Sequence, residues 1–417
     1  MITFGWELEL IVHLQEGEPA GLELQAKKLR ELALSLKYQA PDLPVAAQCS
    51  HNQLSTCCIC EDAPPEFRSF CLRVFTPAEP MFEPGGNSEN LYFHVKKESL
   101  CVPEDQHGNR LAHGFEITSP ILDNEELKSG LPQTEKIVSA IRNSHLSISA
   151  HVRCGLHIHV GVKNGMTLNV AKKAATLVMM LEQPLFTTFS SVSRSEIPAW
   201  FSHIGKKCYF ATKASRECCS ITRENTSRQL LEHLPILPSQ LQPAEWNDSN
   251  PNKWYLALNY IWLTDNMWRL STGLLTDGGA KASLALCTRT KRGKPAYEND
   301  VSNRNGTGGL NGSPSTIEFR YPPTSFDIEF IKCWAEISCK VVEIATRDTS
   351  AFSKVAADLL QELQRDEKES ALPMWARILN VLDLGHQIDF WKQQLERFEA
   401  GEIIRFLDSD GFVLPDY

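Results

Sequence analysis

A chain of 417 residues with 42% hydrophobic and 22% charged residues has the composition of a globular protein, which excludes a chain that is disordered throughout. Its 51 acidic residues outnumber its 42 basic residues and give a formal net charge of −9. A chain this acidic lacks the broad basic surface that attracts a phosphate backbone, so we expect no nucleic acid among its partners.

The first ten residues, MITFGWELEL, contain no basic segment followed by an apolar run, so they do not resemble a signal peptide. No stretch has the apolar length needed to cross a bilayer, which predicts that no membrane is involved. The odd count of 13 cysteines is typical of free thiols in a reducing compartment. We therefore expect a cytoplasmic location, and the sequence leaves open whether the chain forms a homo-oligomer.

A local group of cysteines lies between Cys49 and Cys71. Its Cys-Cys-x-Cys spacing at residues 57–60 does not match the paired C-x2-C knuckles of structural zinc sites. The pattern favours a cysteine-bearing loop over a zinc site.

In chain order, alternating apolar residues predict a strand over residues 3–13, and leucines at mostly helical spacing predict a helix over 21–38. Residues 40–90 are rich in Pro, Cys and acidic residues, so we expect irregular structure with one strand at 70–75. Further along, the pattern predicts strands near 91–96, 114–118 and 154–162, and helices over 134–145 and 169–189.

Residues 190–250 are mixed in character, whereas the aromatic segment 253–270 predicts a helix. A long loop rich in Gly, Asn and Ser covers residues 290–315 and leads into a strand at 316–321. The remaining pattern predicts helices over 327–347, 353–365, 373–384 and 389–400.

Four of the predicted strands have the same pattern, with apolar residues on one face and acidic residues, histidines or an arginine on the other. In the first strand, for example, Trp6 and Leu8 belong to the apolar face, and Glu7 and Glu9 point the opposite way. Across the four strands, the polar faces carry Glu7 and Glu9, then Glu116, then His157 and His159, and finally Glu318 and Arg320.

Each of these pairs alone has an ordinary explanation, since Glu-x-Glu is common on a solvated sheet face and Glu-x-Arg commonly forms an ion pair. The glycines at 155 and 161, however, would leave room for a ligand beside the two histidines. If the strands share one sheet, their polar faces converge, and the carboxylates would repel one another unless a cation binds. Carboxylates with one or two histidines suit Mg²⁺ or Mn²⁺ better than structural Zn²⁺.

The segments that carry these faces resemble the signature blocks of the amidoligase family, which is related to glutamine synthetases and glutamate–cysteine ligases. The four blocks are FGWELEL (4–10), HGFEITSPIL (113–122), CGLHIHVG (154–161) and TIEFRYPPTSFD (316–327). Weaker similarities occur in FHVKKESL (93–100), LEQPLF (181–186), Arg194 and KWYLALN (253–259). Glu98 departs from the family's Asp-x-Ser-Leu segment, because here the acidic residue stands directly beside Ser99.

The resemblance implies an α+β fold: a curved, mostly antiparallel sheet with a concave active-site face and helices packed outside, as in glutamine synthetase. Residues 1–345 would form this catalytic domain, and residues 346–417 a helical extension packed on it. The implied activity is an ATP-dependent carboxylate–amine ligase that forms an acyl phosphate and uses Mg²⁺ or Mn²⁺. Its partners would be small-molecule or peptide carboxylates and amines.

The resemblance also implies a role for each residue in the matching motifs. Arg320 would hold the transferring phosphoryl group with its planar fork, and His159 would contact substrate or phosphate. Arg194 would bind the substrate carboxylate, and Asn259 nucleotide or substrate. The implied metal ligands are Glu7, Glu9, Glu116, His157 and Glu318.

Two other classes of function stay open at this point. One is a metal-dependent hydrolase that uses the same carboxylates and histidines without ATP. The other is a non-catalytic binding protein on the same fold, although every core ligand position holds a competent residue. The loop over residues 290–315 is either a lid whose basic residues screen nucleotide phosphates or an ordinary surface insertion.

Overall fold

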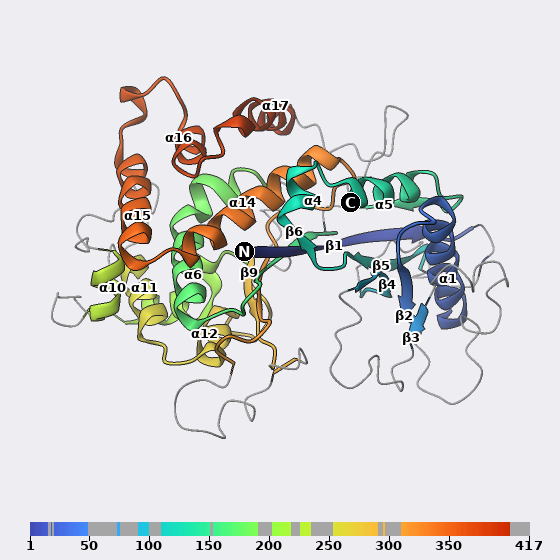
Figure 1. Ribbon diagram of the computed structural model, residues 1–417, viewed down its shortest axis with the longest axis horizontal. Helices are drawn as coiled ribbons and strands as arrows, with labels where there is room; N and C mark the ends of the chain where they lie inside the picture. The colour runs from blue at the N-terminus through green and yellow to red at the C-terminus, as the bar shows by residue number, and fades with distance from the viewer. Residues whose placement is uncertain are drawn as a thin grey trace. The chain divides into compact units, whose positions relative to one another are not determined.

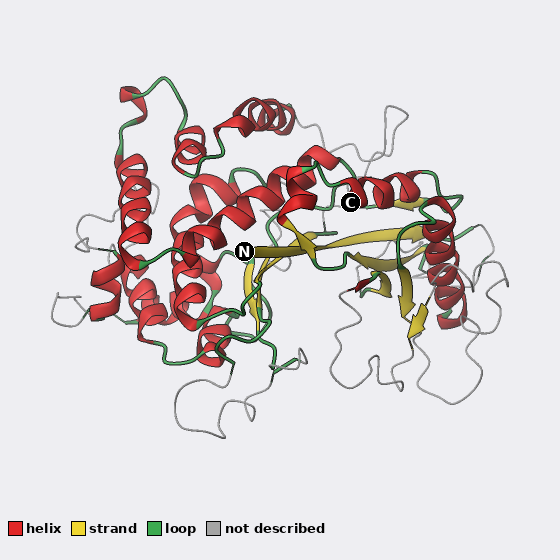
Figure 2. Ribbon diagram, viewed as in Figure 1, coloured by secondary structure: helices red, strands yellow, loops and turns green. Residues whose placement is uncertain are grey.

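The computed structural model (Figures 1 and 2) divides into two compact units. Unit 1 comprises Met1–Thr3, His159–Pro322 and Glu336–Ala400, and unit 2 includes Phe4–Ile158 and Pro323–Ala335. The structure describes residues 1–15, 18, 21–48, 73–75, 91–99, 110–150, 153–190, 202–217, 226–234, 253–290, 295–296 and 310–400.

Unit 2 is built on a mostly antiparallel sheet, with the strand order β3-β2-β4-β5-β1-β8. The strands are β1 (Ile2–His13), β2 (Val45–Gln48), β3 (Arg73–Phe75), β4 (Phe93–Lys97), β5 (Ala112–Thr118) and β8 (Leu156–Val162). Strand β2 pairs in parallel with β3 and β4, whereas β5 pairs antiparallel with β4 and β1. The short strands β6 (Leu122–Asp123) and β7 (Ile148–Ser149) pair with β1.

The apolar face of β1 is buried as its alternation predicts. The indole of Trp6 donates a hydrogen bond of 2.9 Å to Thr134 Oγ1, and its ring contacts Phe93 at 5.8 Å between centroids. Thr134 lies on helix α5 (Pro132–Arg142), which packs against α1 (Leu22–Gln39). Burial of this face leaves the alternate side chains of β1 on the opposite face of the sheet.

Unit 1 is mainly helical (Figure 2), and among its described residues the sheet continues from β8 in the order β8-β10-β9. Strand β10 (Thr316–Phe319) pairs antiparallel with β9 (Leu284–Cys287), and β8 enters this unit at His159. The helices before β9 are α6 (Leu168–Leu181), α8 (Ile204–Lys207), α9 (Tyr209–Arg216), α10 (Arg228–His233), α11 (Lys253–Leu263) and α12 (Met267–Leu274). After β10 come α14 (Ile328–Thr346), which begins in unit 2, and α15 (Thr349–Gln364), α16 (Met374–Val381) and α17 (Ile388–Glu399).

Two buried lysines of α6 tie helix ends together in unit 1. Lys172 Nζ donates to the backbone oxygen of Trp262, near the end of α11, at 2.9 Å. Lys173 Nζ donates to the backbone oxygen of Arg347, just after α14, at 2.6 Å. The C-terminal carbonyls of a helix lack partners within the helix and carry partial negative charge, so they compensate a buried ammonium well.

The C-terminal helices pack on the same unit through aromatic side chains. The ring of Phe189 stacks on Trp391 of α17 with centroids 3.9 Å apart, and it meets Trp375 of α16 edge to face. Residues 346–400 accordingly group with unit 1. The division into a catalytic domain over 1–345 and an extension over 346–417 stays a prediction.

The predicted mixture of helices with a mostly antiparallel sheet is confirmed, whereas the concave glutamine-synthetase-like form stays a prediction. The structure also contains strands that the sequence did not predict, including β2 within the segment 40–90 and β9 before the long loop. Two predicted helices differ from expectation because a local signal interrupts a periodic pattern. The aromatic segment forms two helices because Asn266 Oδ1 accepts a hydrogen bond from Arg269 N and begins α12 anew. Helix α6 changes at Glu182 into a π-helical turn, η2 (Glu182–Thr187), which contains Pro184. Within the described ranges, no helix combines the length and apolar character needed to span a bilayer.

The turn after β8 depends on a glycine. Gly165 has φ of +90°, and a Cβ atom there would lie 2.0 Å from the backbone oxygen of Gly312. We expect Gly165→Ala to lower the free energy of unfolding by roughly 2 kcal/mol or more, through backbone strain and this clash. Urea denaturation measures the change. Gly278→Ala is the control, since a Cβ atom at this position would meet no atom closer than 4.0 Å. An equal loss of unfolding free energy in both variants would contradict the proposed strain and clash at Gly165.

Candidate functional site

The pairing of three strands in unit 2 brings acidic residues of distant segments together. Glu9 of β1 is directly opposite Glu116 of β5, which is opposite Lys96 of β4. Glu7 lies two residues before Glu9 on the same face. With His157 of β8, these residues form what we call the acidic cluster: Glu7, Glu9, Lys96, Glu116 and His157.

Lys96 supplies positive charge within the acidic cluster. Its Nζ lies 2.6 Å from Glu116 Oε1 and 3.9 Å from Glu7 Oε1. Burial disfavours the ammonium, but the two carboxylates outweigh burial and raise the pKa of Lys96. The lysine is therefore charged and bridges two carboxylates of adjacent strands.

One ammonium group does not fully compensate the acidic cluster. Burial, and next the charge of Glu7, raise the pKa of Glu116 to about 8, even though Lys96 acts in the opposite direction. A carboxyl group with so high a pKa is in surroundings that favour additional positive charge. The cluster therefore has the electrostatic character of a cation site.

His157 lies between the two carboxylates of β1. Its Nδ1 is 3.3 Å from Glu7 Oε2, and its Nε2 is 3.8 Å from Glu9 Oε1. The other oxygen of Glu9 accepts a hydrogen bond of 2.6 Å from Gly155 N. Thr324 Oγ1 donates to the backbone oxygen of Glu9 at 2.7 Å, so both the side chain and the backbone of Glu9 are held. The structure thus brings together the predicted residues Glu7, Glu9, Glu116 and His157.

A second group of residues surrounds Glu318 in unit 1, and we call it the Glu318 cluster: His159, Lys281, Cys287, Glu318 and Arg320. Glu318 is fully buried, and Arg320 Nη1 contacts its Oε1. Lys281 Nζ lies 2.5 Å from Oε2, and Cys287 Sγ donates to the same oxygen at 3.0 Å. His159 Nδ1 lies 3.4 Å from the hydroxyl of Thr316, two residues before Glu318.

The structure therefore places the predicted residues in two clusters, one in each unit. His157 and His159 are only two residues apart on β8, yet His157 belongs to the acidic cluster and His159 to the Glu318 cluster. The prediction that all four polar strand faces converge on one surface stays a prediction.

Three members of these clusters were missed by the sequence analysis: Lys96, Lys281 and Cys287. Lys96 lies in the block FHVKKESL, which resembles the family's Asp-x-Ser-Leu segment. Because Lys96 follows the apolar Val95, the alternation of apolar and polar residues could have placed it on the polar face of this strand. Lys281 precedes the short strand β9 and Cys287 ends it, and the four residues LALC of this strand carry no recognisable period. The pairing of β9 with β10 brings both residues near Glu318.

Other predicted features have different surroundings. Asn259 is buried in α11, and its Oδ1 accepts a hydrogen bond of 2.8 Å from Ser227 N, which positions the start of α10; its nucleotide contact stays a prediction. The glycine at 161 leaves no open space, because a Cβ there would lie 3.0 Å from Thr3 Oγ1. Arg194, the Cys49–Cys71 segment and most of the loop over 290–315 lie outside the described residues.

Glu182 organises the region of unit 1 that follows β10. It is completely buried, and Tyr321, adjacent to Arg320, donates a hydrogen bond of 2.8 Å to its Oε1. The backbone N–H groups of Ile204 and Gly205 each donate to its carboxylate at 2.7 Å. The carboxylate of Glu182 in η2 therefore connects this turn to α8 and to the chain after β10.

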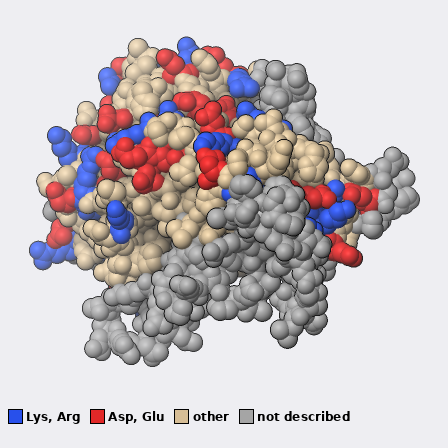
Figure 3. All heavy atoms as spheres, turned by 45° about the vertical axis from the view of Figure 1, so that its right-hand side comes forward, with Lys and Arg blue, Asp and Glu red and all other residues tan. Residues whose placement is uncertain are grey.

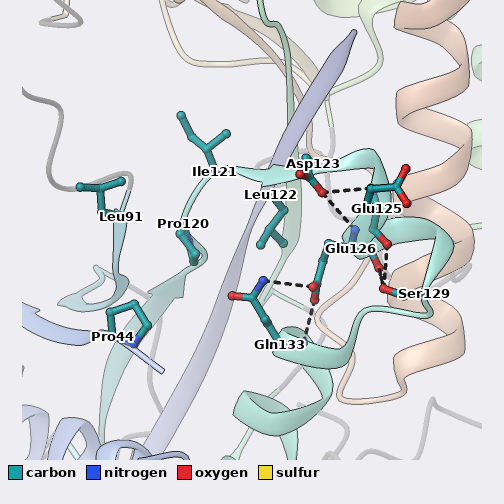
Figure 4. A pocket seen from close by; sticks show the side chains of 10 residues that line it. All are labelled: Pro44, Leu91, Pro120, Ile121, Leu122, Asp123, Glu125, Glu126, Ser129 and Gln133. Atoms are coloured by element: carbon teal, nitrogen blue, oxygen red, sulfur yellow. Dashed lines mark hydrogen bonds between the residues drawn. The ribbon is translucent and has the colours of Figure 1, made fainter. Parts of the chain in front are cut away.

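Figure 4 shows a pocket in unit 2 that contains none of the predicted site residues. Its lining residues are Pro44, Leu91, Pro120, Ile121, Leu122, Asp123, Glu125, Glu126, Ser129 and Gln133. Asp123 accepts hydrogen bonds from the first N–H groups of α4 (Asn124–Lys128), and Glu126 accepts from Gln133 N at 2.7 Å. Asp123 and Glu126 thus accept hydrogen bonds from N–H groups at the starts of α4 and α5. On the face in Figure 3, basic and acidic side chains are interspersed.

The protonation of Glu182 should affect stability. Burial raises its pKa to about 7 from an ordinary value near 4.5, so the folded protein binds this proton more tightly than the unfolded chain. The resulting stabilisation is complete below pH 4.5 and is lost as pH rises through about 7. It is on the order of 3 kcal/mol, since one pKa unit is worth about 1.4 kcal/mol.

We therefore expect the thermal midpoint of Glu182→Gln to fall less between pH 4.5 and 7 than that of the unmodified protein. Calorimetry across this pH range measures the difference. Glu232→Gln, on the exposed surface of α10, should keep the original slope. Identical slopes for Glu182→Gln and the unmodified protein would mean that Glu182 stays ionised throughout.

Comparison with known proteins adds one match. The model of a family described as "Putative amidoligase enzyme" matches residues 87–245. This confirms the family resemblance seen in the sequence and indicates a ligase-type enzyme. The matched range contains Glu116, His157 and His159, whereas the blocks with Glu7, Glu9, Glu318 and Arg320 lie outside it. No curated protein matches the chain.

Proposed function

We propose that this protein is an ATP-dependent carboxylate–amine ligase that forms an amide or peptide-like bond through an acyl phosphate. The observation that carries the proposal is the acidic cluster, in which three carboxylates and an imidazole lie on neighbouring strands beside the ammonium of Lys96. The family match over residues 87–245 supports a ligase rather than another metal-dependent enzyme.

The acidic cluster fits Mg²⁺ in both donor type and charge. Its carboxylate oxygens are the hard ligands that Mg²⁺ prefers, and the ammonium of Lys96 already lies where two of them attract a cation. In the proposal, Glu7, Glu9, Glu116 and His157 hold Mg²⁺, and Glu318 keeps the ligand role that the resemblance implies. When bound, Mg²⁺ neutralises charge on the phosphates of ATP.

The Glu318 cluster supplies cationic side chains for phosphate. Glu318 of β10 fixes the guanidinium of Arg320, two residues further along the chain, and holds the ammonium of Lys281. A guanidinium fork binds two phosphate oxygens at once, so Arg320 contacts the transferring phosphoryl group. Lys281 adds a second positive charge, and His159 contacts substrate or phosphate.

The proposed reaction has two balanced steps. A substrate carboxylate oxygen attacks the γ-phosphorus of ATP, the bond to the β-phosphate oxygen breaks, and ADP leaves. An amine nitrogen then attacks the acyl carbon, phosphate leaves with the bonding electrons, and the nitrogen loses one proton. The substrate acid and amine are small molecules or peptide groups that bear a free carboxylate and a free amine.

The ligase activity is tested by incubating the protein with ATP, Mg²⁺ and pools of carboxylates and amines, and measuring ADP. We expect ADP release to need both an acid and an amine. Glu9→Gln and Glu318→Gln should each abolish it, because each removes a charge on which the proposed site depends. Glu232→Gln should retain full activity.

Two results would contradict this proposal. Failure of every substrate pool to raise ADP above the blank would count against a ligase, and bond cleavage without ATP would favour a hydrolase. Full activity in both Glu9→Gln and Glu318→Gln, with both proteins folded by circular dichroism, would refute the site assignment.

Metal binding is tested separately with Lys96→Met. Removing the ammonium leaves the buried Glu116 without its ionic partner, which should cost about 3 kcal/mol or more in stability. We expect Mg²⁺ to raise the thermal midpoint of this variant more than that of the unmodified protein, because the ion replaces the lost charge. Lys97→Met, an exposed neighbour on β4, should behave like the unmodified protein, and equal Mg²⁺ shifts in all three would exclude the acidic cluster as the metal site.

A further inference from the structure

We propose that His159, Cys287 and Glu318 form a binding site for a thiophilic divalent ion such as Zn²⁺, distinct in ligand chemistry from the acidic cluster. The proposal does not require ligase activity. It shares Glu318 and His159 with the proposed function, so an ion bound here would compete with the roles of these two residues in the ligase reaction.

The three residues come from three neighbouring strands, β8, β9 and β10. Cys287 of β9 is directly opposite Thr316 of β10, whose hydroxyl lies 3.4 Å from His159 Nδ1 of β8. One ligand atom each from His159, Cys287 and Glu318 lies within 4.8 Å of the other two. In a tetrahedral zinc site, with bonds of about 2.0–2.3 Å, ligand atoms are roughly 3–4 Å apart. The three ligand atoms therefore lie close to the spacing of a zinc site.

The donor types select the kind of ion. A thiolate, an imidazole and a single carboxylate suit Zn²⁺ or Co²⁺, whereas Mg²⁺ takes oxygen ligands almost exclusively. The residues of the acidic cluster, by contrast, provide three carboxylates and no sulfur ligand, a set that suits Mg²⁺ better than Zn²⁺. The two clusters are therefore expected to prefer different ions.

Lys281 competes with an ion at this site. Its ammonium lies 2.5 Å from Glu318 Oε2, the same oxygen that accepts the hydrogen bond from the thiol of Cys287. The Lys281 side chain is 47% exposed, so its end can turn toward solvent while Glu318 stays buried. An incoming ion takes the place of the ammonium and of the thiol proton, and the proton is released to solvent.

Because Lys281 competes with the ion, removing its ammonium should increase the affinity for the ion. Lys281→Met should tighten Zn²⁺ binding about tenfold, because the ion no longer displaces an ammonium from a buried carboxylate. Cys287→Ser should weaken binding at this site severely, because a hydroxyl is a poor zinc ligand. Cys339→Ser, which alters a buried cysteine of α14, should leave binding unchanged.

The test uses Zn²⁺ and Co²⁺ alone, without ATP or substrate, on the full chain. Zn²⁺ should protect Cys287 from alkylation by iodoacetamide, read by mass spectrometry of its peptide, whereas Mg²⁺ should not. Added Co²⁺ should give a sulfur-to-metal absorption band that is smaller in Cys287→Ser than in Cys339→Ser. Titration of Lys281→Met gives the change in affinity.

Equal alkylation of Cys287 with and without Zn²⁺ would overturn the proposal, and this measurement needs no variant to fold. Equal cobalt spectra for the two cysteine variants would overturn it as well. Because no step involves ATP, failure here leaves the ligase proposal intact, and absence of ADP release would not affect the metal-binding result.

Discussion

A carboxylate buried on a sheet is stable only when positive charge or several hydrogen-bond donors compensate it. Both clusters are organised by this constraint. Lys96 reaches Glu116 from the neighbouring strand, whereas Glu318 is contacted by Arg320, just after the end of β10, and by Lys281 from the segment before β9. Glu182, in the π-helical turn η2 and not on the sheet, represents the other solution, since two backbone N–H groups and a tyrosine hydroxyl donate hydrogen bonds to it.

The sequence was sufficient to predict β1, β4, β5, β8 and β10, but not β9, which carries Cys287. In β1 and β8 the alternation of apolar and polar residues is long enough to reveal a buried face, and it correctly placed Glu7, Glu9, His157 and His159 opposite that face. The match to the family model supports the same interpretation for the middle of the chain. Local periodicity was informative here because each strand buries one side against helices.

The partners of those residues could not be predicted in the same way. Lys96, Lys281 and Cys287 acquire their roles through strand register and side-chain reach, which depend on contacts between segments far apart in sequence. Likewise, Asn259 looked like a ligand residue, but its amide oxygen accepts a hydrogen bond from a neighbouring helix start. The residue types in a sequence show which chemical groups could act in a site. The hydrogen bonds in the structure show which of these groups already have a partner.

Strand β8 imposes a further restriction, because His157 and His159 are alternate residues of one extended segment. Residues two positions apart on a strand are separated by roughly 6.5 Å, a spacing that the backbone sets and rotamers alter little. Loss or gain of a single residue between them would turn every later side chain of the strand to the other face. Evolution can therefore exchange the residues around these two imidazoles much more easily than it can change the length of the strand that spaces them.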